Sequence, residues 1–304
     1  MTIKVSLIQH TPAFFDKEAI FSGMERTLES EAQKGADLIV FPESFIPGYP
    51  RGFSFGAKVG SRSEEGRDHY RDYHKSSVDL STEDGKRLEE MARRHGVYLC
   101  VGLTEKVADN GSLYCSMVYI CPDKGMLGTH RKIKPTASER VIWAEGDGSD
   151  LITCDTKLGR MGGLICWENY MPEARLAMYR KGVQLYIAPT ADARDNWIAS
   201  MQHIALEGRC FVLACNQYVE KKDIPEKYRS LLSPEPEVLC RGGSVIMSPM
   251  GEILAGPLWN KTGIVSAELD TDEITRSKLD FDVNGHYARP DIFHFDVKDQ
   301  PDTV

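Results

Sequence analysis

The stretch QKGADLIVFPE, residues 33–43, joins the end of a helix to a buried strand. Gly35 predicts the end of an amphipathic helix over residues 17–33, because glycine readily adopts the backbone found after a helix C-terminus. The apolar run that follows predicts a strand over residues 36–43, ending on the carboxylate of Glu43. Upstream, KVSLIQ (4–9) also has strand character, so the chain opens with a strand–helix–strand unit.

Further along, the pattern changes from alternation of strands and helices to hairpins. Hairpins are predicted over residues 113–133 and 151–166, and the last strands over 243–269. Additional helices are predicted over 82–94, 172–181, 196–208 and 271–278, and additional strands over 97–105, 183–189 and 210–217. This mixture favours a layered α/β fold over a purely parallel sheet.

The chain shows neither internal repeats nor a linker composition, so we expect one domain over residues 1–304. Its core should span about residues 3–280, followed by a short C-terminal tail over 281–304. Residues 220–237 are charged and contain prolines, which is typical of a surface excursion.

The composition of the 304-residue chain argues against several classes of function. The net charge of -8 disfavours binding to nucleic acids or to anionic membranes, since both need a basic surface. The N-terminal apolar run is too short for a signal peptide, and no later run approaches the length of a membrane span. We therefore expect a cytoplasmic protein.

The eight cysteines are expected to be reduced thiols, since the sequence shows no secretion signal. Most lie in apolar strand-like runs, where cysteine behaves as a small hydrophobic residue. No CxxC pair is present, and His69 and His74 are five residues apart rather than four. We therefore expect no metal site.

Three predicted strand ends carry reactive groups: Glu43, the basic run around Lys132, and Cys166. Strand ends at one edge of a sheet are where sites assemble in α/β proteins. The three groups complement one another chemically, because a carboxylate can take the proton of a thiol and an ammonium can stabilise the anion formed after attack. The set suits addition of a thiol to a nitrile or an amide, with the backbone N–H of Trp167 as a second possible donor.

Each residue also has an ordinary structural interpretation when it is taken alone. Cys166 is compatible with a core cysteine, Lys132 with a solvated charge, and Glu43 with a helix cap or an exposed acid. Two other classes of function stay open on the same residues. The chain could be a binding module that kept the fold without its chemistry, or a redox sensor that uses Cys166.

Five blocks of sequence resemble a known family. FPESFIPGYPRGF (41–53), HRKIKPTASER (130–140), CWENYMP (166–172) and PTADARDNW (189–197) look like the signature blocks of the nitrilase branch of the carbon–nitrogen hydrolase superfamily. GHYARPDIF (285–293) resembles the C-terminal motif of true nitrilases. The blocks occur in the family's order and run through nearly the whole chain.

The resemblance implies a four-layer α-β-β-α sandwich, no metal or organic cofactor, and a homodimer or a larger homo-oligomer. It places the base on Glu43, the lysine on Lys132, the nucleophile on Cys166 and a second carboxylate on Glu139. An ion pair with Arg140 or Arg131 is the alternative for Glu139.

The residues after the cysteine distinguish branches of the superfamily. Trp167-Glu168-Asn169 looks like nitrilases and cyanide-degrading enzymes, whereas amidase and carbamoylase branches tend to carry Cys-Tyr-Asp or Cys-His-Asp. The resemblance therefore implies hydrolysis of a small-molecule nitrile to a carboxylic acid and ammonia. An amidase or carbamoylase, or a cyanide-degrading enzyme on the same scaffold, stays open as the alternative.

Several further residues are candidates for the substrate pocket or its support. The predicted substrate-binding residues are Trp167, Tyr49, Tyr170, Thr190 and Trp143. Ordinary packing is the alternative for each of them. Glu207 is a candidate buried partner of the lysine, with a helix-end ion pair as its alternative, and His130 and His286 are expected to make structural hydrogen bonds.

Overall fold

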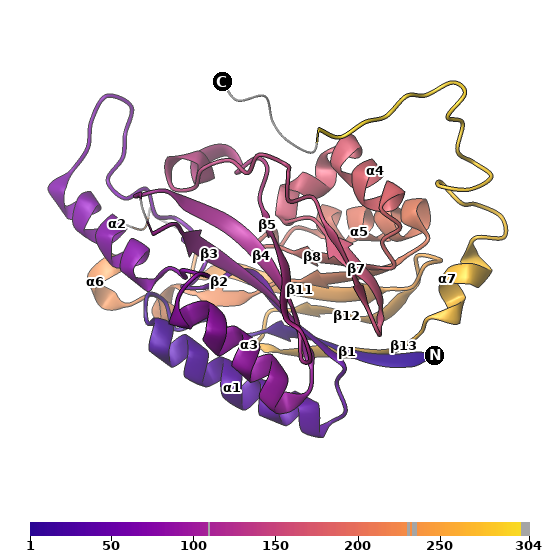
Figure 1. Cartoon of the computed structure of the whole chain (residues 1–304). Helices are drawn as coiled ribbons and strands as arrows, with labels where there is room; N and C mark the ends of the chain where they lie inside the picture. The colour runs from indigo at the N-terminus through magenta and orange to yellow at the C-terminus, as the bar shows by residue number, and fades with distance from the viewer. Residues whose placement is uncertain (109, 230–231, 233–235, 299–304) are drawn as a thin grey trace.

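The computed structural model describes residues 1–108, 110–229, 232 and 236–298. Two β-sheets lie face to face, and helices cover the outer face of each sheet (Figure 1). The four layers confirm the α-β-β-α sandwich expected from the sequence. The mixed pattern of strands also agrees, because each sheet combines parallel with antiparallel pairs.

The first sheet has the strand order β13-β1-β2-β3-β4-β5, with β1, β2 and β3 parallel to one another. Its strands are β1 (Thr2–Gln9), β2 (Leu38–Ile46), β3 (Tyr98–Lys106), β4 (Leu113–Cys121), β5 (Gly125–Arg131) and β13 (Gly263–Asp270). Helices α1 (Lys17–Gln33) and α3 (Glu83–His95) pack on its outer face. The carboxylate of Asp16 caps α1 by accepting the N–H of Ala19 at 3.0 Å.

The second sheet has the strand order β10-β11-β9-β8-β7-β6, with β12 paired to β11. Its strands are β6 (Thr153–Thr156), β7 (Gly159–Gly163), β8 (Leu185–Pro189), β9 (Phe211–Cys215), β10 (Tyr218–Glu220), β11 (Val238–Met247) and β12 (Ile253–Trp259). Helices α4 (Pro172–Arg180) and α5 (Asp195–Gly208) cover its outer face.

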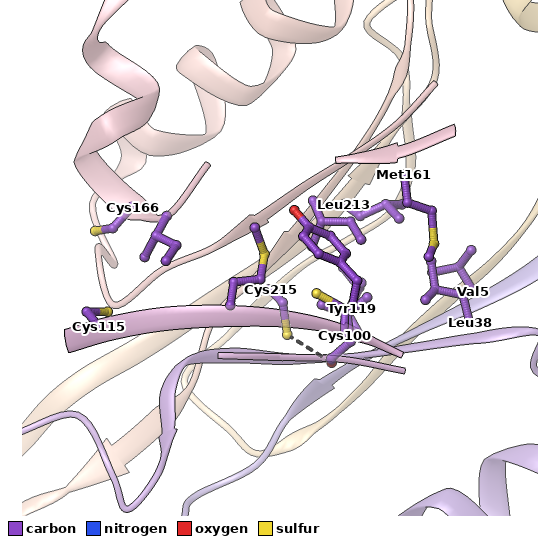
Figure 2. Close-up of a cluster of buried hydrophobic side chains, with 14 of the residues drawn as sticks. Val5, Leu38, Cys100, Cys115, Tyr119, Met161, Cys166, Leu213 and Cys215 are labelled. Carbon is purple, nitrogen blue, oxygen red and sulfur yellow. Dashed lines mark hydrogen bonds between the residues drawn. The ribbon is translucent and has the colours of Figure 1, made fainter. Parts of the chain in front are cut away.

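Alternation of side chains along the strands builds three apolar layers from two sheets. In β2, Leu38 and Val40 face the opposite sheet, whereas Ile39 and Phe41 face α1 and α3. Because both faces of these strands are buried, their sequences read as continuous apolar runs. Figure 2 shows the cluster between the sheets, which reaches from Val5 and Leu38 to Cys166.

The structure adds elements that the sequence pattern did not predict. Helix α2 (Glu64–Ser76) is strongly polar, and it starts where the Ser63 hydroxyl accepts the N–H of Gly66 at 3.0 Å. Strand β10 ends at the first residue of the segment predicted as a surface excursion, and the short α6 (Glu226–Arg229) lies within that segment. Residues 230–231 and 233–235 of the segment lie outside the described residues. Helix α7 (Asp272–Ser277), by contrast, follows the last strand where a helix was predicted over residues 271–278. Each helix in the described part of the chain is too short or too polar to cross a lipid bilayer.

The sequence predicts that this strand ends at Glu43, but in the structure β2 continues to Ile46. Its pairing with β3 shifts between Phe41 and Ile46, and Ser44 takes a positive φ of 47°. Such a bulge re-aims a side chain out of the regular pleat. The apolar run alone does not reveal this extension, because the bulge is built by contacts with β3.

Strand β7 corrects a second boundary, since it ends at Gly163 rather than at Cys166. Cys166 instead begins a short 3₁₀ helix, Cys166–Tyr170, with a positive φ of 51°. A non-glycine residue in this conformation is uncommon, and it is tolerated where the surrounding structure enforces it. The cysteine therefore lies on a tight turn beyond the sheet edge.

Gly102 of β3 makes room for the bulge that carries Glu43. A Cβ at this position would lie 2.2 Å from the carbonyl oxygen of Pro42 and 2.8 Å from the Cα of Glu43. Gly102→Ala should therefore lower the free energy of unfolding by about 2 kcal/mol or more, because backbone has to shift. Chemical denaturation measures this effect. Gly111→Ala is the matched control, since no atom lies within 4 Å of its added Cβ; equal stability of the two variants would contradict the close approach.

Candidate active site

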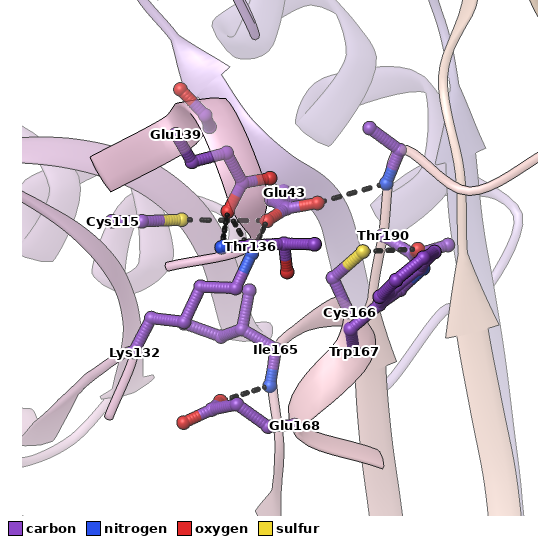
Figure 3. A network of polar contacts seen from close by, with 12 residues as sticks. Glu43, Cys115, Lys132, Thr136, Glu139, Ile165, Cys166, Trp167, Glu168 and Thr190 are labelled. Carbon is purple, nitrogen blue, oxygen red and sulfur yellow. Dashed lines mark hydrogen bonds and ion pairs between the residues drawn. The ribbon is translucent and has the colours of Figure 1, made fainter. Parts of the chain in front are cut away.

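A buried lysine lies at the centre of the site. Lys132 follows β5 directly, and its backbone N–H donates to the carbonyl of Cys115 in β4 at 2.8 Å. Its Nζ donates to Glu43 Oε1 and to Glu139 Oε2, both at 2.7 Å (Figure 3). Burial acts to lower the pKa of Lys132, but the nearby acidic groups, Glu43 foremost, hold it well above its usual value. Lys132 is therefore a permanent cation in a pocket almost closed to water.

Glu43 is held from several sides. Its second oxygen accepts the backbone N–H of Ala191 at 2.9 Å, and the Cys115 thiol lies 3.6 Å from Oε1. Burial raises the pKa of Glu43, whereas the ammonium of Lys132 acts in the opposite direction. A carboxylate with a raised pKa is a better proton acceptor than an exposed one, which suits a general base.

Glu139 is presented by a 3₁₀ helix, Ala137–Val141, that follows the lysine. Its Oε2 accepts the backbone N–H of Thr136 at 2.6 Å in addition to the Lys132 ammonium, and its Oε1 accepts the hydroxyl of Tyr49 at 2.6 Å. The alternative pairing with Arg131 does not occur, since that guanidinium binds Glu105. The carboxylate is thus fully occupied in holding Lys132 and Tyr49.

Cys166 comes from the second sheet and meets this charged cluster. Its Sγ accepts the hydroxyl of Thr190 at 3.1 Å, and its side chain also interacts with Glu43. Burial raises the pKa of the Cys166 thiol, and the Glu43 carboxylate raises it further. The resting side chain is therefore a neutral thiol, so attack on carbon requires a base to take its proton.

Glu168 ties the segments that carry Lys132 and Cys166 to each other. Its two carboxylate oxygens accept the backbone N–H groups of Ile133 and Ile165, each at 2.7 Å. The same carboxylate pairs with His130 Nε2 at 3.0 Å, and His130 Nδ1 lies 3.1 Å from Asp150. Burial acts to lower the pKa of His130, but Glu168 and Asp150 raise it to about 10. The structural hydrogen bonds expected of His130 are present.

A cavity of about 540 Å³ opens onto the sulfur of Cys166. It is lined by Tyr49, Arg51, Thr136, Ala137, Ser138, Glu139, Cys166, Trp167, Ala191, Asp192, Ala193, Arg194, Val238, Leu239, Arg241 and Asn260. A larger cavity of about 860 Å³ lies over residues 55–70 and touches none of the four clustered residues. The chemistry of the side chains therefore singles out the smaller cavity.

The predicted site residues fall into two groups in the structure. Glu43, Lys132, Glu139 and Cys166 come together, and Tyr49 and Trp167 line the cavity. Thr190 contacts the sulfur. Trp143 and Tyr170 are not among the described residues that line the cavity; they pack behind Tyr49 and Trp167, with ring centroids 5.7 Å apart in both pairs.

Glu207 is not a partner of Lys132, so the prediction of a buried contact with the lysine is wrong. Its alternative, an ion pair at a helix end, agrees with the structure. It accepts the Nε of Arg175 at 2.9 Å and the hydroxyl of Tyr179 at 2.8 Å. The eight cysteines are all free and buried, in line with the expectation of reduced thiols. Within the described residues, no group of three or more His, Cys, Asp or Glu side chains is placed to hold a metal ion.

Four charged residues of the cavity were not predicted: Arg51, Asp192, Arg194 and Arg241. The first three lie inside the quoted sequence blocks 41–53 and 189–197, so a signal was present. The sequence does not show which of these charged side chains form ion pairs, and the fold does. Arg241 comes from β11 and lies outside every block.

Residues 4–278 match the model of the carbon-nitrogen hydrolase family, and the chain therefore belongs to the carbon–nitrogen hydrolases. Its relatives place it in the nitrilase branch of that family. An aliphatic nitrilase of Sinorhizobium fredii is 46% identical, over 98% of this chain and 96% of its own length. A bifunctional nitrilase/nitrile hydratase of Nicotiana tabacum is 47% identical, over 98% of this chain and 86% of its own length.

Solved structures share the fold at lower sequence identity. A carbon-nitrogen hydrolase from Helicobacter pylori has a TM-score of 0.77 and is 21% identical, with 96% of this chain and 97% of that chain covered. An amidase from Nesterenkonia sp. has a TM-score of 0.65 at 20% identity, with 91% of this chain and 94% of that one covered. The sandwich is thus common to the family.

The raised pKa of His130 predicts a pH dependence of stability. Because the pKa of His130 is about 10 in the folded protein, the ring keeps its proton up to that pH, whereas the unfolded chain releases it near the ordinary histidine pKa of 6.5. The stabilisation is therefore complete below about pH 6.5 and is lost as the pH rises towards 10. His130→Gln should remove this dependence, so the stability difference between wild type and variant should shrink over that range.

Denaturation curves between pH 6 and 10 measure this difference. His203→Gln is the control, because His203 is 65% exposed and its one ion pair among the described residues is with Glu207. A difference between wild type and His130→Gln that stays constant with pH would contradict a charged, buried His130.

Proposed function

We propose that the chain is a nitrilase that hydrolyses an organic nitrile to a carboxylic acid and ammonia, with Cys166 as the nucleophile. The observation that carries the proposal is the contact of Cys166, which lines the cavity, with the buried Glu43, whose carboxylate pairs with Lys132. Close relatives that carry nitrilase names support the same reaction. No cofactor is needed, because the side chains supply a nucleophile, a base and a cation.

In the first step, the Cys166 sulfur bonds to the nitrile carbon. Glu43 takes the thiol proton and passes it to the nitrile nitrogen, which gives a covalent thioimidate. Negative charge develops on that nitrogen, and the ammonium of Lys132 stabilises it. The ammonium does not have to move to do so, because two carboxylates already hold it in place. The backbone N–H of Trp167, in the first turn of its 3₁₀ helix, is a second donor for the same charge.

In the later steps, two waters are consumed. Glu43 takes a proton from the first water as its oxygen bonds to the thioimidate carbon. Glu43 passes that proton to the nitrogen, and the hydroxyl left on the carbon gives up the second proton of the water as it becomes a carbonyl. The nitrogen leaves as ammonia with both protons, and an acyl-thioester remains on Cys166. A second water attacks the thioester in the same way, the carbon–sulfur bond breaks, and the thiol recovers its proton as the carboxylic acid leaves.

Glu139 acts here as a positioning residue. It completes the pair of carboxylates around Lys132 and holds Tyr49 in the wall of the cavity. Thr190 orients the sulfur through its hydroxyl, which is itself fixed because its oxygen accepts the N–H of Asp192 at 2.9 Å. These contacts restrict the nucleophile to one direction, which is how geometry lowers a barrier.

The setting of the enzyme forms part of the proposal. We propose one catalytic domain over residues 1–304, working in the cytoplasm on a small-molecule nitrile, as a homodimer or larger homo-oligomer. The family match over residues 4–278 supports one domain, since it takes in all four residues of the cluster.

Ammonia release from matched nitriles and amides tests the reaction. Phenylacetonitrile with phenylacetamide and butanenitrile with butanamide form two such pairs. We expect release from at least one nitrile, and Cys166→Ala should lower its rate by roughly 1,000-fold or more, since the covalent route is lost. Cys154→Ala is the matched control, because this cysteine is also buried between the sheets but lies outside the cluster.

The alternatives give different results in the same assay. Release from the amides alone would indicate an amidase or carbamoylase, and turnover of cyanide alone would indicate a cyanide-degrading enzyme. Unchanged nitrile turnover by Cys166→Ala would refute the covalent mechanism. Chromatography of the acid and amide products completes the test, because one group of relatives is named for both nitrilase and nitrile hydratase activity.

A further inference from the structure

Three arginines line the cavity above Cys166, and two of them have a carboxylate partner. Arg194 Nε lies 2.8 Å from Asp192 Oδ1, and Arg241 Nη2 lies 2.6 Å from Asp195 Oδ1. The third, Arg51, forms no ion pair within the described residues. Its positive charge is therefore the one in this group that no neighbouring acid neutralises directly.

The contacts of Arg51 fix its position and leave much of its guanidinium available. One nitrogen donates to the carbonyl of Ala191, and the Cys240 thiol lies beside the group. The guanidinium carbon stands 5.5 Å from the centre of the Tyr49 ring. A guanidinium has five N–H donors in a planar fork, so further hydrogen bonds can be made without moving the side chain.

Arg51 is held on both flanks by residues that touch the reacting groups. Ala191 donates its N–H to Glu43, and Tyr49 donates its hydroxyl to Glu139. Arg51 and Cys166 line the same cavity of about 540 Å³. A substrate whose nitrile reaches the sulfur therefore has its other end inside a space that contains this cation.

Part of the wall is suited to a short carbon chain, although polar side chains such as Asp192 and Asn260 also line the cavity. Apolar surface comes from Ala191, Ala193, Trp167, Val238 and Leu239. A chain of methylene groups loses contact with water on this surface, whereas an anion at its end needs a charged partner to offset its desolvation. A carboxylate matches the planar fork of a guanidinium through two parallel hydrogen bonds.

We infer that Arg51 binds a carboxylate at the far end of the substrate, so that short aliphatic cyanocarboxylates are the preferred nitriles of this enzyme. The inference rests on the proposed nitrilase activity and specifies its substrate class. Arg51 acts as a substrate-binding residue and takes no part in the bond changes at Cys166.

The positive charge of Arg51 could instead stabilise the catalytic cluster, and this role makes a different prediction. Lys132 carries one positive charge between the two carboxylates of Glu43 and Glu139, so Arg51 would balance the excess negative charge of that cluster. In that case its removal would slow the chemical step for every substrate. Substrate binding instead predicts a loss confined to anionic nitriles and seen mainly in KM.

The test compares isosteric nitriles that differ in charge. 4-Cyanobutanoate and 5-methylhexanenitrile have the same number of methylene groups, with a carboxylate in one where the other has an isopropyl group. 3-Cyanopropanoate and 4-methylpentanenitrile form a shorter pair. Steady-state ammonia release gives kcat and KM for each compound with wild type, Arg51→Gln and Arg51→Lys.

We expect wild type to favour a cyanocarboxylate over its neutral analogue by roughly ten-fold or more in kcat/KM, as for a charge-assisted hydrogen bond. Arg51→Gln should remove this preference by raising KM for the anion while leaving the neutral nitriles near wild type. Arg51→Lys keeps the charge but not the fork, so it should retain part of the preference. Arg241→Gln removes an already paired charge from the same cavity and should leave the ratio between the two compounds unchanged.

Three results would overturn the inference. A wild-type enzyme that hydrolyses neutral nitriles and shows no preference for the anions refutes it, while the proposed nitrilase activity stands. An equal loss of kcat for both compounds in Arg51→Gln and Arg51→Lys, with circular dichroism showing both variants folded, assigns the residue to the charge balance of the cluster. Failure to hydrolyse any nitrile removes the proposed function and the inference together.

Discussion

The burial of the Lys132 ammonium between two carboxylates is the constraint on which the rest of the site depends. A charge removed from water is strongly destabilising unless it is paired and hydrogen-bonded. Glu43 and Glu139 meet this requirement at 2.7 Å each. They are in turn held by the backbone of Ala191 and Thr136, so the cluster exists only when loops from distant parts of the chain are in place.

The stacking of two sheets provides those loops. Glu43 comes from a bulge in β2 and Lys132 from the end of β5, both in the first sheet, whereas Cys166 follows β7 in the second. Glu168 bridges the chain next to Lys132 and the chain next to Cys166 through two backbone hydrogen bonds. The distance between nucleophile and cation is thus set by the packing between sheets, which resists small displacements because the interior is close-packed.

Local sequence patterns predicted which segments form helices and strands, but they did not predict the backbone conformation at the strand ends that carry the site. Helix 17–33 and most strands followed from apolar periodicity and glycine positions, and Glu43, Lys132, Cys166 and Glu139 followed from their sequence blocks. The bulge in β2 and the turn at Cys166 depend on contacts between segments far apart in the chain, to which a short window is blind. The partners of a side chain are equally non-local. The sequence therefore did not distinguish Arg194, which pairs with Asp192, from Arg51, which has no acidic partner among the residues that the structure describes.

The covalent adduct is the most direct test of the central claim, that Cys166 attacks the nitrile carbon inside this charged cluster. The measurement is intact-protein and peptide mass spectrometry on enzyme quenched in acid during turnover of a nitrile substrate. The account predicts a mass increase equal to the acyl or imidoyl group of that substrate, carried by the peptide that contains Cys166 and absent from Cys166→Ala. Turnover with no adduct on Cys166 under these conditions, or an adduct on another cysteine, would contradict it.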